Sequence, residues 1–360
     1  MRILIDINHP AHVHLFKNFA WEMEKRGHEF VFTTRLKEVT IDLLAEYGFK
    51  CYSFGDHYKS VLGKLWGFFI FGWKLLKRAR KFKPDLFLSM GGIYASHVAY
   101  ILGKPHIALD DTEHARSHHV LYVPFTATCL NPSCFHKDFG KKQLFYHGYH
   151  ELAYLHPNWF KPDPKIRSML GLKKDEKFVF MRFVSWNASH DVGQSGIPDD
   201  IKIELIRILS GYAKVFISSE GRLLPELEKY RLKTPPEMIH HVLAFASLFI
   251  GEGSTMASEA ACLGTPAIYV NSLEVGYCTE QEKYGLVYNF RNPNGIIDKA
   301  VQLITDPNLG TKYKDRQQNM LKEKIDVTAF LIWFVENYPE SVGIMQKNLD
   351  YDNQFITAMS

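Results

Sequence analysis

Short apolar runs alternate with amphipathic segments along most of the chain. A run of about five to seven apolar residues predicts a buried strand, whereas apolar positions three or four apart over a longer segment predict a helix. In the first half, strands are predicted at 2–7, 28–34, 50–54, 85–90 and 106–110, and helices at 13–26, 36–48 and 96–103. Strands that alternate with helices at this spacing predict a doubly wound α/β domain with a parallel sheet.

The pattern breaks between residues 156 and 177, where three prolines and a run of charges predict loop structure. It then restarts, with strands predicted at 177–183, 213–219, 247–253 and 267–270 and helices at 199–210, 223–230, 255–263 and 295–305. We therefore expect a Rossmann-like domain at 1–160, a linker at 161–176, a second Rossmann-like domain at 177–330 and a helical tail at 331–360. Two such domains predict a ligand cleft between the carboxyl ends of their sheets.

Composition narrows the class of protein. Of the 360 residues, 46% are hydrophobic and 23% charged, which is typical of a globular protein and excludes collagen-like or disordered chains. The longest uncharged apolar run, residues 65–73, is far shorter than the roughly 20 residues of a membrane-spanning helix. Five scattered cysteines without a CxxC pair, and a start directly on the first strand, favour a cytoplasmic protein without a disulfide framework.

Charge is distributed unevenly. Residues 1–160 hold 20 Lys and Arg against 14 Asp and Glu, and 14 of the 17 histidines; the remainder holds 23 against 25. The basic half should therefore meet an anionic partner or surface. Residues 65–83 join an aromatic run to six Lys and Arg, which indicates either a core helix or a patch that docks on anionic lipid headgroups at the inner face of the membrane. Nucleic acid is disfavoured, because no recognised binding motif accompanies these cations.

The strongest local signal lies in residues 248–270. An apolar strand there runs into a glycine-rich turn that ends at Gly253, and Ser254 and Thr255 follow at the expected start of a helix. Free N–H groups and the positive end of the helix dipole favour a phosphate at such a start. Glu259 lies on the same helix face as Thr255, where its carboxylate can accept hydrogen bonds from ribose hydroxyls. The pattern predicts a bound nucleotide; the alternative is an ordinary turn with a capping Ser and a solvated Glu.

Residues 259–266 (EAACLGTP) resemble the E-A-x-x-x-G-x-P string of GT-B-fold nucleotide-sugar enzymes. The string resembles that of the N-acetylglucosaminyltransferase of lipid II synthesis and of the non-hydrolysing UDP-N-acetylglucosamine 2-epimerases. Overall the chain is most similar to an uncharacterised bacterial and archaeal GT-B-like family. The resemblance implies that Glu259 holds the ribose and the preceding turn the diphosphate. It also implies that Glu280 and Gln281 bind the donor sugar.

The first half resembles the transferase through residues 83–116, which contain a GMGGY-like turn and an acidic loop. The opening NHPAHVH matches the family's glycine-rich first loop in part, keeping its His as His12. The resemblance implies that the acceptor side is formed by Asn8, Gly91, Gly92 and Asp110.

Candidate acid–base residues come from the same two loops. Adjacent carboxylates raise one another's pKa, so Asp111, with Glu113 nearby, is a candidate general base; a charged surface loop is the alternative. The neutral imidazole of His12 can accept a proton, orient Asp111 or contact the donor phosphate, although it can also simply bond the loop backbone. The loop after the strand at 177–183 offers three further ligands for the diphosphate: Ser185, Asn187 and His190.

These observations predict a glycosyltransferase that moves a sugar from a UDP-sugar to a cell-surface glycan or lipid-linked acceptor. We expect no metal, because no Asp-x-Asp string stands at a strand end and the HxxHxH string lacks a known metal spacing, and no cofactor besides the donor substrate. A UDP-sugar 2-epimerase and a catalytically silent nucleotide-sugar-binding protein are the alternatives. The GMGGY-like turn and the aromatic-basic segment favour the transferase.

Overall fold

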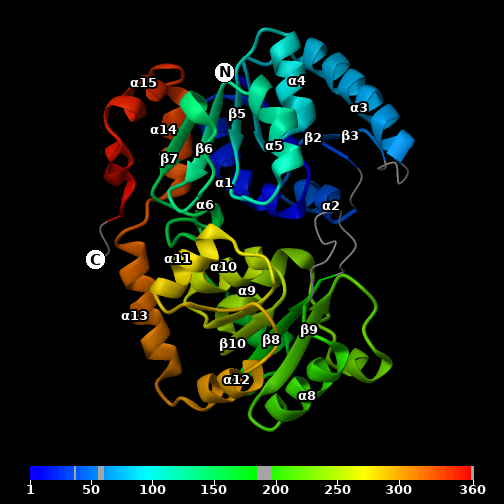
Figure 1. Cartoon of the computed structure of the whole chain (residues 1–360), viewed down its shortest axis with the longest axis vertical. Coiled ribbons are helices and arrows are strands. Elements are labelled where there is room, and N and C mark those ends of the chain that lie inside the picture. Colours follow the sequence, from blue (N-terminus) through cyan, green and yellow to red (C-terminus); the bar gives the residue numbers. More distant parts are fainter. Residues whose placement is uncertain (36–37, 56–60, 185–195, 358–360) are drawn as a thin grey trace. The chain divides into compact units, whose positions relative to one another are not determined.

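The computed structural model describes residues 1–35, 38–55, 61–184 and 196–357, which form two compact units (Figure 1). Unit 1 comprises residues 1–154 and 324–357, and unit 2 comprises residues 155–323. Each unit is built on a parallel sheet with helices around it, so the predicted pair of α/β domains is confirmed. No helix in the described ranges has both the length and the apolarity needed to cross a membrane.

Unit 1 contains a seven-stranded parallel sheet in the order β3-β2-β1-β4-β5-β6-β7. Its strands are β1 (Arg2–Ile7), β2 (Glu29–Thr34), β3 (Cys51–Ser53), β4 (Leu86–Met90), β5 (His106–Leu109), β6 (Thr128–Pro132) and β7 (Gln143–Tyr146). The central strands are continuous apolar runs because helices cover both faces of such a sheet. The strand order reverses between β1 and β4.

The helices of unit 1 cover this sheet. They are α1 (Pro10–Lys25), α2 (Glu38–Glu46), α3 (Val61–Phe82), α4 (Ile93–Ile101), α5 (Arg116–Tyr122), α6 (Leu152–Leu155, at the boundary between the units), α14 (Val327–Glu336) and α15 (Glu340–Lys347), with 3-10 turns at Val123–Phe125, Gly140–Lys142 and Tyr351–Phe355. Helix α1 begins three residues before its predicted start, because His9 caps it by accepting from the Ala11 N–H and Pro10 suits the first helical position.

The C-terminal helices belong to unit 1, which differs from the predicted separate tail at 331–360. Thr328 in α14 and Asn18 in α1 both donate to the carbonyl of Ala153. Asp352 accepts from the backbone N–H of His147 and lies 3.0 Å from its ring nitrogen Nδ1. These buried contacts join segments far apart in sequence, and no local sequence pattern reports them.

Unit 2 contains a five-stranded parallel sheet in the order β12-β11-β10-β8-β9. Its strands are β8 (Phe178–Phe183), β9 (Lys214–Ser219), β10 (Leu248–Gly251), β11 (Ala267–Val270) and β12 (Val287–Phe290). Its helices are α7 (Lys165–Met169), α8 (Asp199–Leu209), α9 (Ile239–Phe245), α10 (Ser254–Leu263), α11 (Gly276–Lys283), α12 (Ile296–Thr305) and α13 (Leu309–Leu321). The helix predicted at 223–230 is a 3-10 helix, Pro225–Tyr230, and a second one spans Pro236–Met238. The strand order reverses between β8 and β10.

The predicted linker at 161–176 is a folded part of unit 2. It contains α7, and the Arg167 guanidinium donates to the carbonyls of Lys173 and Glu176 at 3.0 and 2.8 Å. The backbone N–H of Asp163 donates to His241 of α9. Its prolines therefore shape a packed loop rather than a free connection.

Candidate functional site

The start of α10 lies at the point where the strand order of unit 2 reverses, the usual place for a ligand in an open α/β sheet. Its N-cap residue is Gly253, with φ −98° and ψ 125°, and no side chain of the described residues caps the helix. The first N–H groups of a helix lack partners within it, and the helix dipole is positive at this end. The geometry at Gly253, Ser254 and Thr255 thus fits a phosphate group; their role as phosphate ligands stays a prediction.

Packing requires glycine at only one of the two glycine positions before α10. A Cβ atom at Gly251 would lie 2.5 Å from the Phe249 ring and 3.2 Å from the Arg182 carbonyl oxygen, so packing requires glycine there. A Cβ atom at Gly253 would meet only Val184 Cγ1, at an ordinary 3.6 Å. Gly253 is therefore not needed for packing, and its small size leaves room over the helix start.

Glu252, between these glycines, ties down both ends of the segment that follows β8. Its buried carboxylate accepts from the backbone N–H groups of Val184 at 2.9 Å and Ile197 at 2.7 Å. Glu252 thereby joins two described positions, Val184 and Ile197, and sequence reasoning missed this role although its place between two glycines was visible. The predicted ligands between these two positions lie outside the described residues: Ser185, Asn187 and His190.

Glu259 lies on α10 and is paired with His240 of α9. The His240 Nε2 atom is 3.0 Å from Glu259 Oε1, and both side chains are buried. The imidazole fixes the direction of the carboxylate, which is the arrangement a ligand carboxylate needs. Sequence reasoning missed His240, because nothing local marks a residue 19 positions earlier as its partner.

Helix α11 packs against α10 through polar side chains. Tyr277 donates to Ser254 Oγ at 2.7 Å, and Gln281 donates to Ser258 Oγ at 2.8 Å. Gln281 is fully buried, so its amide contacts α10 rather than an open donor-sugar site. Glu280, its predicted companion, is half-buried on the same helix. The two residues thus differ in accessibility, and Glu280 is the one left nearer the surface.

At the corresponding reversal in unit 1, two glycines stand between β4 and α4. Gly91 has φ +55°, a conformation that L side chains rarely adopt, and its Cβ would approach the Tyr122 ring at 3.3 Å. Gly92 is the N-cap of α4 and donates to Ser89 Oγ at 2.8 Å; its Cβ would clash with that side chain. Both predicted acceptor-side glycines therefore have a structural requirement, which neither supports nor opposes ligand contact.

His12 lies in the first turn of α1, at the other side of this reversal. The backbone N–H of Asn8 donates to His12 Nδ1 at 3.3 Å. A nitrogen that accepts a hydrogen bond carries no proton, so the neutral ring is protonated on Nε2. That tautomer donates through Nε2 and cannot accept a proton there. This contact suits His12 as a hydrogen-bond donor to an oxyanion, and its role as a general base stays a prediction.

The carboxylate of Asp110, directly after β5, is contacted by three other residues. Tyr122 donates to Oδ2, the Thr112 N–H donates to Oδ1, and His119 Nε2 lies 3.0 Å from Oδ2. Burial raises the pKa of this carboxyl, but the contacts with His119 and Tyr122 outweigh it and hold the pKa below its ordinary value. Asp110 is therefore a charged group engaged within the fold, whereas the sequence suggested an acceptor-side ligand.

Asp111 points to a different partner, His150, which follows β7. His150 Nδ1 is 3.0 Å from Asp111 Oδ2, within ion-pair distance, and both side chains are buried. Burial lowers the pKa of His150, but the Asp111 carboxylate outweighs this and raises it above its ordinary value. The buried Nε2 atom has no hydrogen-bond partner among the described residues. A carboxylate at Nδ1 leaves the lone pair of the neutral ring on Nε2, where it can accept a proton.

Sequence reasoning missed His150, because the strand that it follows, β7, was itself not predicted. It also missed Asp6 at the end of β1, which accepts from Thr33 at 2.8 Å and lies 3.9 Å from Arg35. Burial raises the pKa of Asp6. Glu113, a predicted catalytic residue, is half-buried on the loop after β5. Unit 1 therefore has three carboxylates, each close to an arginine or a histidine, at the carboxyl ends of β1 and β5.

The aromatic-basic segment 65–83 forms most of α3, which has one buried and one exposed face; contact with lipid headgroups stays a prediction. One face is core, with Phe71, Leu75 and Ala79 buried. The opposite face exposes Phe69 and Trp73, which are 64% and 62% accessible, beside exposed lysines. The helix thus carries an exposed surface that is both apolar and cationic.

A protein-family model and a curated relative match this sequence. The sequence model described as "Protein of unknown function (DUF354)" matches residues 1–339. An uncharacterised protein of Methanocaldococcus jannaschii is 26% identical, over 74% of this chain and 80% of the relative.

Solved structures show the fold. The UDP-GlcNAc 2-epimerase of Neisseria meningitidis, bound to UDP-GlcNAc, aligns with a TM-score of 0.62 at 12% identity and covers 97% of this chain and 99% of its own. The glycosyltransferase VinC, in complex with dTDP, aligns with a TM-score of 0.61 at 14% identity, covering 97% and 100%. The chain has the two-domain, Rossmann-like GT-B fold of these nucleotide-sugar enzymes, and the predicted resemblance is confirmed.

Proposed function

This chain belongs to the DUF354 family, and we propose that it is an enzyme that transfers a sugar from a UDP-sugar to an acceptor. The observation that carries the proposal is the uncapped start of α10 at the reversal point of the unit 2 sheet, with Gly253 leaving room above it. Solved structures of the same fold contain UDP-GlcNAc or dTDP, which supports a nucleoside diphosphate as the ligand. The donor is a substrate, and no further cofactor is proposed.

Unit 2 would bind the donor. The N–H groups at the start of α10 would hold the diphosphate, and Ser254 and Thr255 would add hydroxyl donors. Glu259, oriented by His240, would accept hydrogen bonds from the ribose hydroxyls. Hydrogen bonds to a charged group are worth about 1.5–3 kcal/mol each, so this carboxylate would account for a substantial part of nucleotide affinity.

Unit 1 would supply the proton chemistry. His150 would accept a proton from the attacking acceptor hydroxyl at Nε2, while Asp111 holds the ring and stabilises the imidazolium that forms. Because Nε2 is buried in this structure, acceptor binding must open the surroundings of His150. His12 would donate a hydrogen bond through Nε2 to an oxyanion of the donor.

The acceptor would be a cell-surface glycan or a lipid-linked sugar at the membrane. The support is the outer face of α3, where Phe69 and Trp73 are exposed on the same helix as a run of cations. Aromatic side chains with neighbouring Lys and Arg suit a surface of anionic headgroups. This face would bring the enzyme to an acceptor that stays in the bilayer.

Calorimetry with UDP tests the proposal. Gly253→Asp places a carboxylate at the N-cap of α10, which should stabilise the helix but repel the diphosphate, so we expect UDP affinity to fall about tenfold or more without loss of thermal stability. Gly310→Asp is the matched control, because it adds the same charge to the first turn of α13 in the same unit, where a Cβ meets nothing within 4 Å. Equal UDP affinity in both variants would contradict a diphosphate site on α10.

The second candidate is a UDP-sugar 2-epimerase, favoured by the several ionisable groups of unit 1, since inversion at a carbon requires proton transfer without an acceptor. Incubation with UDP-GlcNAc alone separates the two. Epimer formation or UDP release without an acceptor would indicate the isomerase. A sugar donor that stays intact until an acceptor is added would indicate the transferase. Binding without turnover under any condition would indicate a nucleotide-sugar-binding protein.

A further inference from the structure

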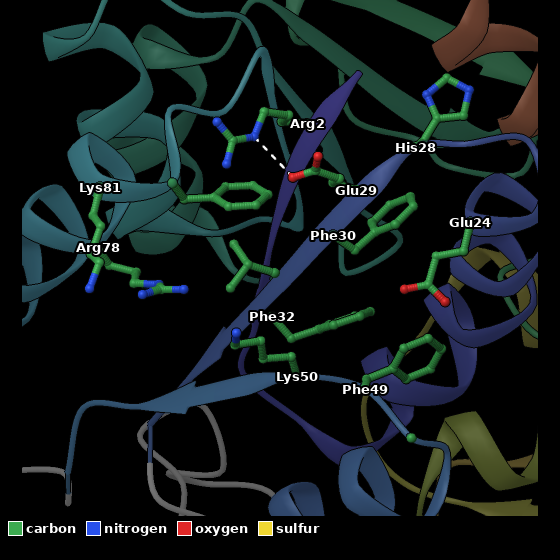
Figure 2. Close-up of a pocket in the computed structure, with 13 residues that line it drawn as sticks. Arg2, Glu24, His28, Glu29, Phe30, Phe32, Phe49, Lys50, Arg78 and Lys81 are labelled. Atoms are coloured by element: carbon green, nitrogen blue, oxygen red, sulfur yellow. Dashed lines mark hydrogen bonds and ion pairs between the residues drawn. The ribbon is translucent and has the colours of Figure 1, made fainter.

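A cavity of 540 Å³ lies at the amino edge of the unit 1 sheet, the opposite edge from Asp111 and His150 (Figure 2). Its lining comes from the first residues of β1 and β2, from the segment before β3 and from the last turns of α1 and α3. This volume is in the range of sites for small organic molecules. The cavity belongs entirely to unit 1 and shares no residue with the site described above.

The floor of the cavity is aromatic. Phe30 and Phe32 come from β2, and Phe49 comes from the turn before β3; the Phe32 and Phe49 rings lie 4.8 Å apart. Phe32 and Phe49 are almost fully buried, whereas Phe30 is half-buried and offers accessible ring surface. The apolar or planar part of a ligand could rest on Phe30.

The walls of the cavity are charged, and they carry more Lys and Arg side chains than Glu side chains. Arg2 and Glu29 pair with each other at 3.2 Å, and the Arg2 guanidinium also lies 4.7 Å over the Phe82 ring. Figure 2 shows Arg78 and Lys81 on one side of the cavity and Glu24 on the opposite side.

The remaining cations have no carboxylate partner in the described ranges: Lys50, Arg78 and Lys81. The Arg78 guanidinium stacks on the Tyr52 ring at 3.4 Å, and its buried Nε atom has no hydrogen-bond partner among the described residues. Stacking holds the planar group by its face and leaves its N–H edge for an acceptor. Arg78 and Lys81 are three positions apart on α3, so they lie on one face of that helix. A buried donor without a partner is costly unless a ligand completes it.

We propose that this cavity binds an organic phosphate, with the phosphate held by Lys50, Arg78 and Lys81 and the apolar part of the ligand on Phe30. A dianionic phosphate matches the surplus of cations, and Arg is suited to bidentate contact with phosphate oxygens. The ligand is either a soluble phosphate ester or the headgroup of a lipid phosphate, which share this chemistry. The site is separate from the nucleotide site, so it would act as a second, regulatory or anchoring site.

The probe is 1-naphthyl phosphate, titrated into the full-length protein in the presence of saturating UDP. We expect the wild-type protein to bind it, and to bind inorganic phosphate more weakly because inorganic phosphate lacks the apolar part. Arg78→Gln and Lys50→Gln should each lower the affinity about tenfold or more, since each removes a charge-assisted contact. Lys77→Gln is the matched control on the same helix, because Lys77 lies 5.5 Å over the exposed Trp73 ring and does not line the cavity.

Three results would overturn the proposal: no binding by the wild-type protein, displacement of the probe by UDP, or equal affinity in Arg78→Gln and Lys77→Gln. Thermal unfolding and UDP affinity of each variant show whether it is folded. If UDP itself does not bind, the proposed function fails, but the comparison of Arg78→Gln with Lys77→Gln still tests this site.

Vesicles separate the two sources of the phosphate. Arg78-dependent cosedimentation with phosphatidylcholine vesicles that contain phosphatidic acid, but not with phosphatidylcholine alone, would identify a lipid phosphate. Binding of the soluble probe without Arg78-dependent cosedimentation would identify a free phosphate ester. Either result supports the proposed site. A protein that neither binds the soluble probe nor shows Arg78-dependent cosedimentation would contradict it.

Discussion

At the carboxyl edge of its sheet, unit 1 presents paired ionisable side chains, whereas unit 2 presents the backbone N–H groups of a helix start. Three carboxylates of unit 1 face cationic or imidazole partners: Asp6, Asp110 and Asp111. In unit 2 the reversal point carries Gly253 and an uncapped α10. A helix dipole keeps its charge at every pH, whereas an imidazole gains and loses a proton near neutrality. The difference suits unit 2 to hold a permanent anion and unit 1 to move protons.

The largest expected effect follows from replacing either member of the proposed acid–base pair, His150 and Asp111. We expect His150→Ala and Asp111→Asn to lower turnover by roughly 10² to 10⁴, which is the usual contribution of general acid–base catalysis. UDP affinity should stay unchanged in both, because the nucleotide is assigned to unit 2. Turnover with UDP-GlcNAc and an acceptor, together with calorimetry, measures the two effects separately. Near-normal turnover in both variants would remove this pair from the mechanism.

The corresponding experiment in unit 2 replaces Glu259. Glu259→Ala should weaken UDP binding by a few kcal/mol at most, because up to two hydrogen bonds to a carboxylate are lost at about 1.5–3 kcal/mol each. Helix propensity favours Ala, but the buried His240 loses its partner, so part of any loss in stability has that origin. His240→Asn is the companion variant, expected to reduce affinity less, since the carboxylate remains. A Glu259→Ala protein with wild-type UDP affinity would end the ribose assignment.

Two adjacent aspartates allow a comparison within unit 1. Asp110 is engaged by Tyr122 and His119, so Tyr122→Phe should cost about 1–3 kcal/mol of unfolding free energy by leaving a buried charge without one donor. The same substitution should change UDP affinity little. Chemical denaturation measures the first quantity. If Tyr122→Phe is as stable as the wild-type protein, the contact with Asp110 is not a structural one.

A change of pH should affect the two units differently, with a smaller effect than the substitutions above. The Asp111 carboxylate raises the pKa of His150 above its ordinary 6.5 despite burial. Only the neutral ring accepts a proton, so turnover should rise as pH increases through this raised pKa. Stability should move in the opposite sense. The charged pair contributes fully below about pH 6.5 and its contribution is lost as pH rises through the folded-state pKa.

UDP affinity, measured above about pH 7 where the diphosphate is ionised, should change little over the same window. His150→Ala should abolish the pH dependence of stability that belongs to this pair. Turnover that falls as pH rises in this window would show that the charged ring acts, and would exclude its role as a base.

The smallest expected effect is that of chelation. The proposed diphosphate site relies on the helix start rather than on a cation, so EDTA should leave turnover unchanged. The measurement is the initial rate before and after chelation, followed by addition of Mn²⁺. Activity that is lost on chelation and restored by Mn²⁺ would contradict the metal-independent mechanism and direct attention to the His and Asp loops of unit 1.

The amino-acid pattern predicted much of the architecture. Continuous apolar runs identified β1, β2, β4, β5, β8, β9, β10 and β11, because a strand buried on both faces has few polar residues. It did not identify β6 and β12, in which polar residues such as Asn131 and Asn289 interrupt the run. Nor did it identify β7, whose four residues are too few for a periodic pattern. Local chemistry also located α10, since the glycine turn and the following hydroxyl residues are adjacent in sequence.

The sequence by itself determined which loops lie at the carboxyl ends of the strands, and therefore where ligand chemistry is to be sought. Only the tertiary structure decided what each side chain there can do. Asp110 and Asp111 are neighbours and look alike in sequence, yet one is held by Tyr122 and His119 and the other faces His150. The reason is physical: the charge and direction of a buried group depend on partners that the fold brings from distant segments, and a linear pattern carries no record of them.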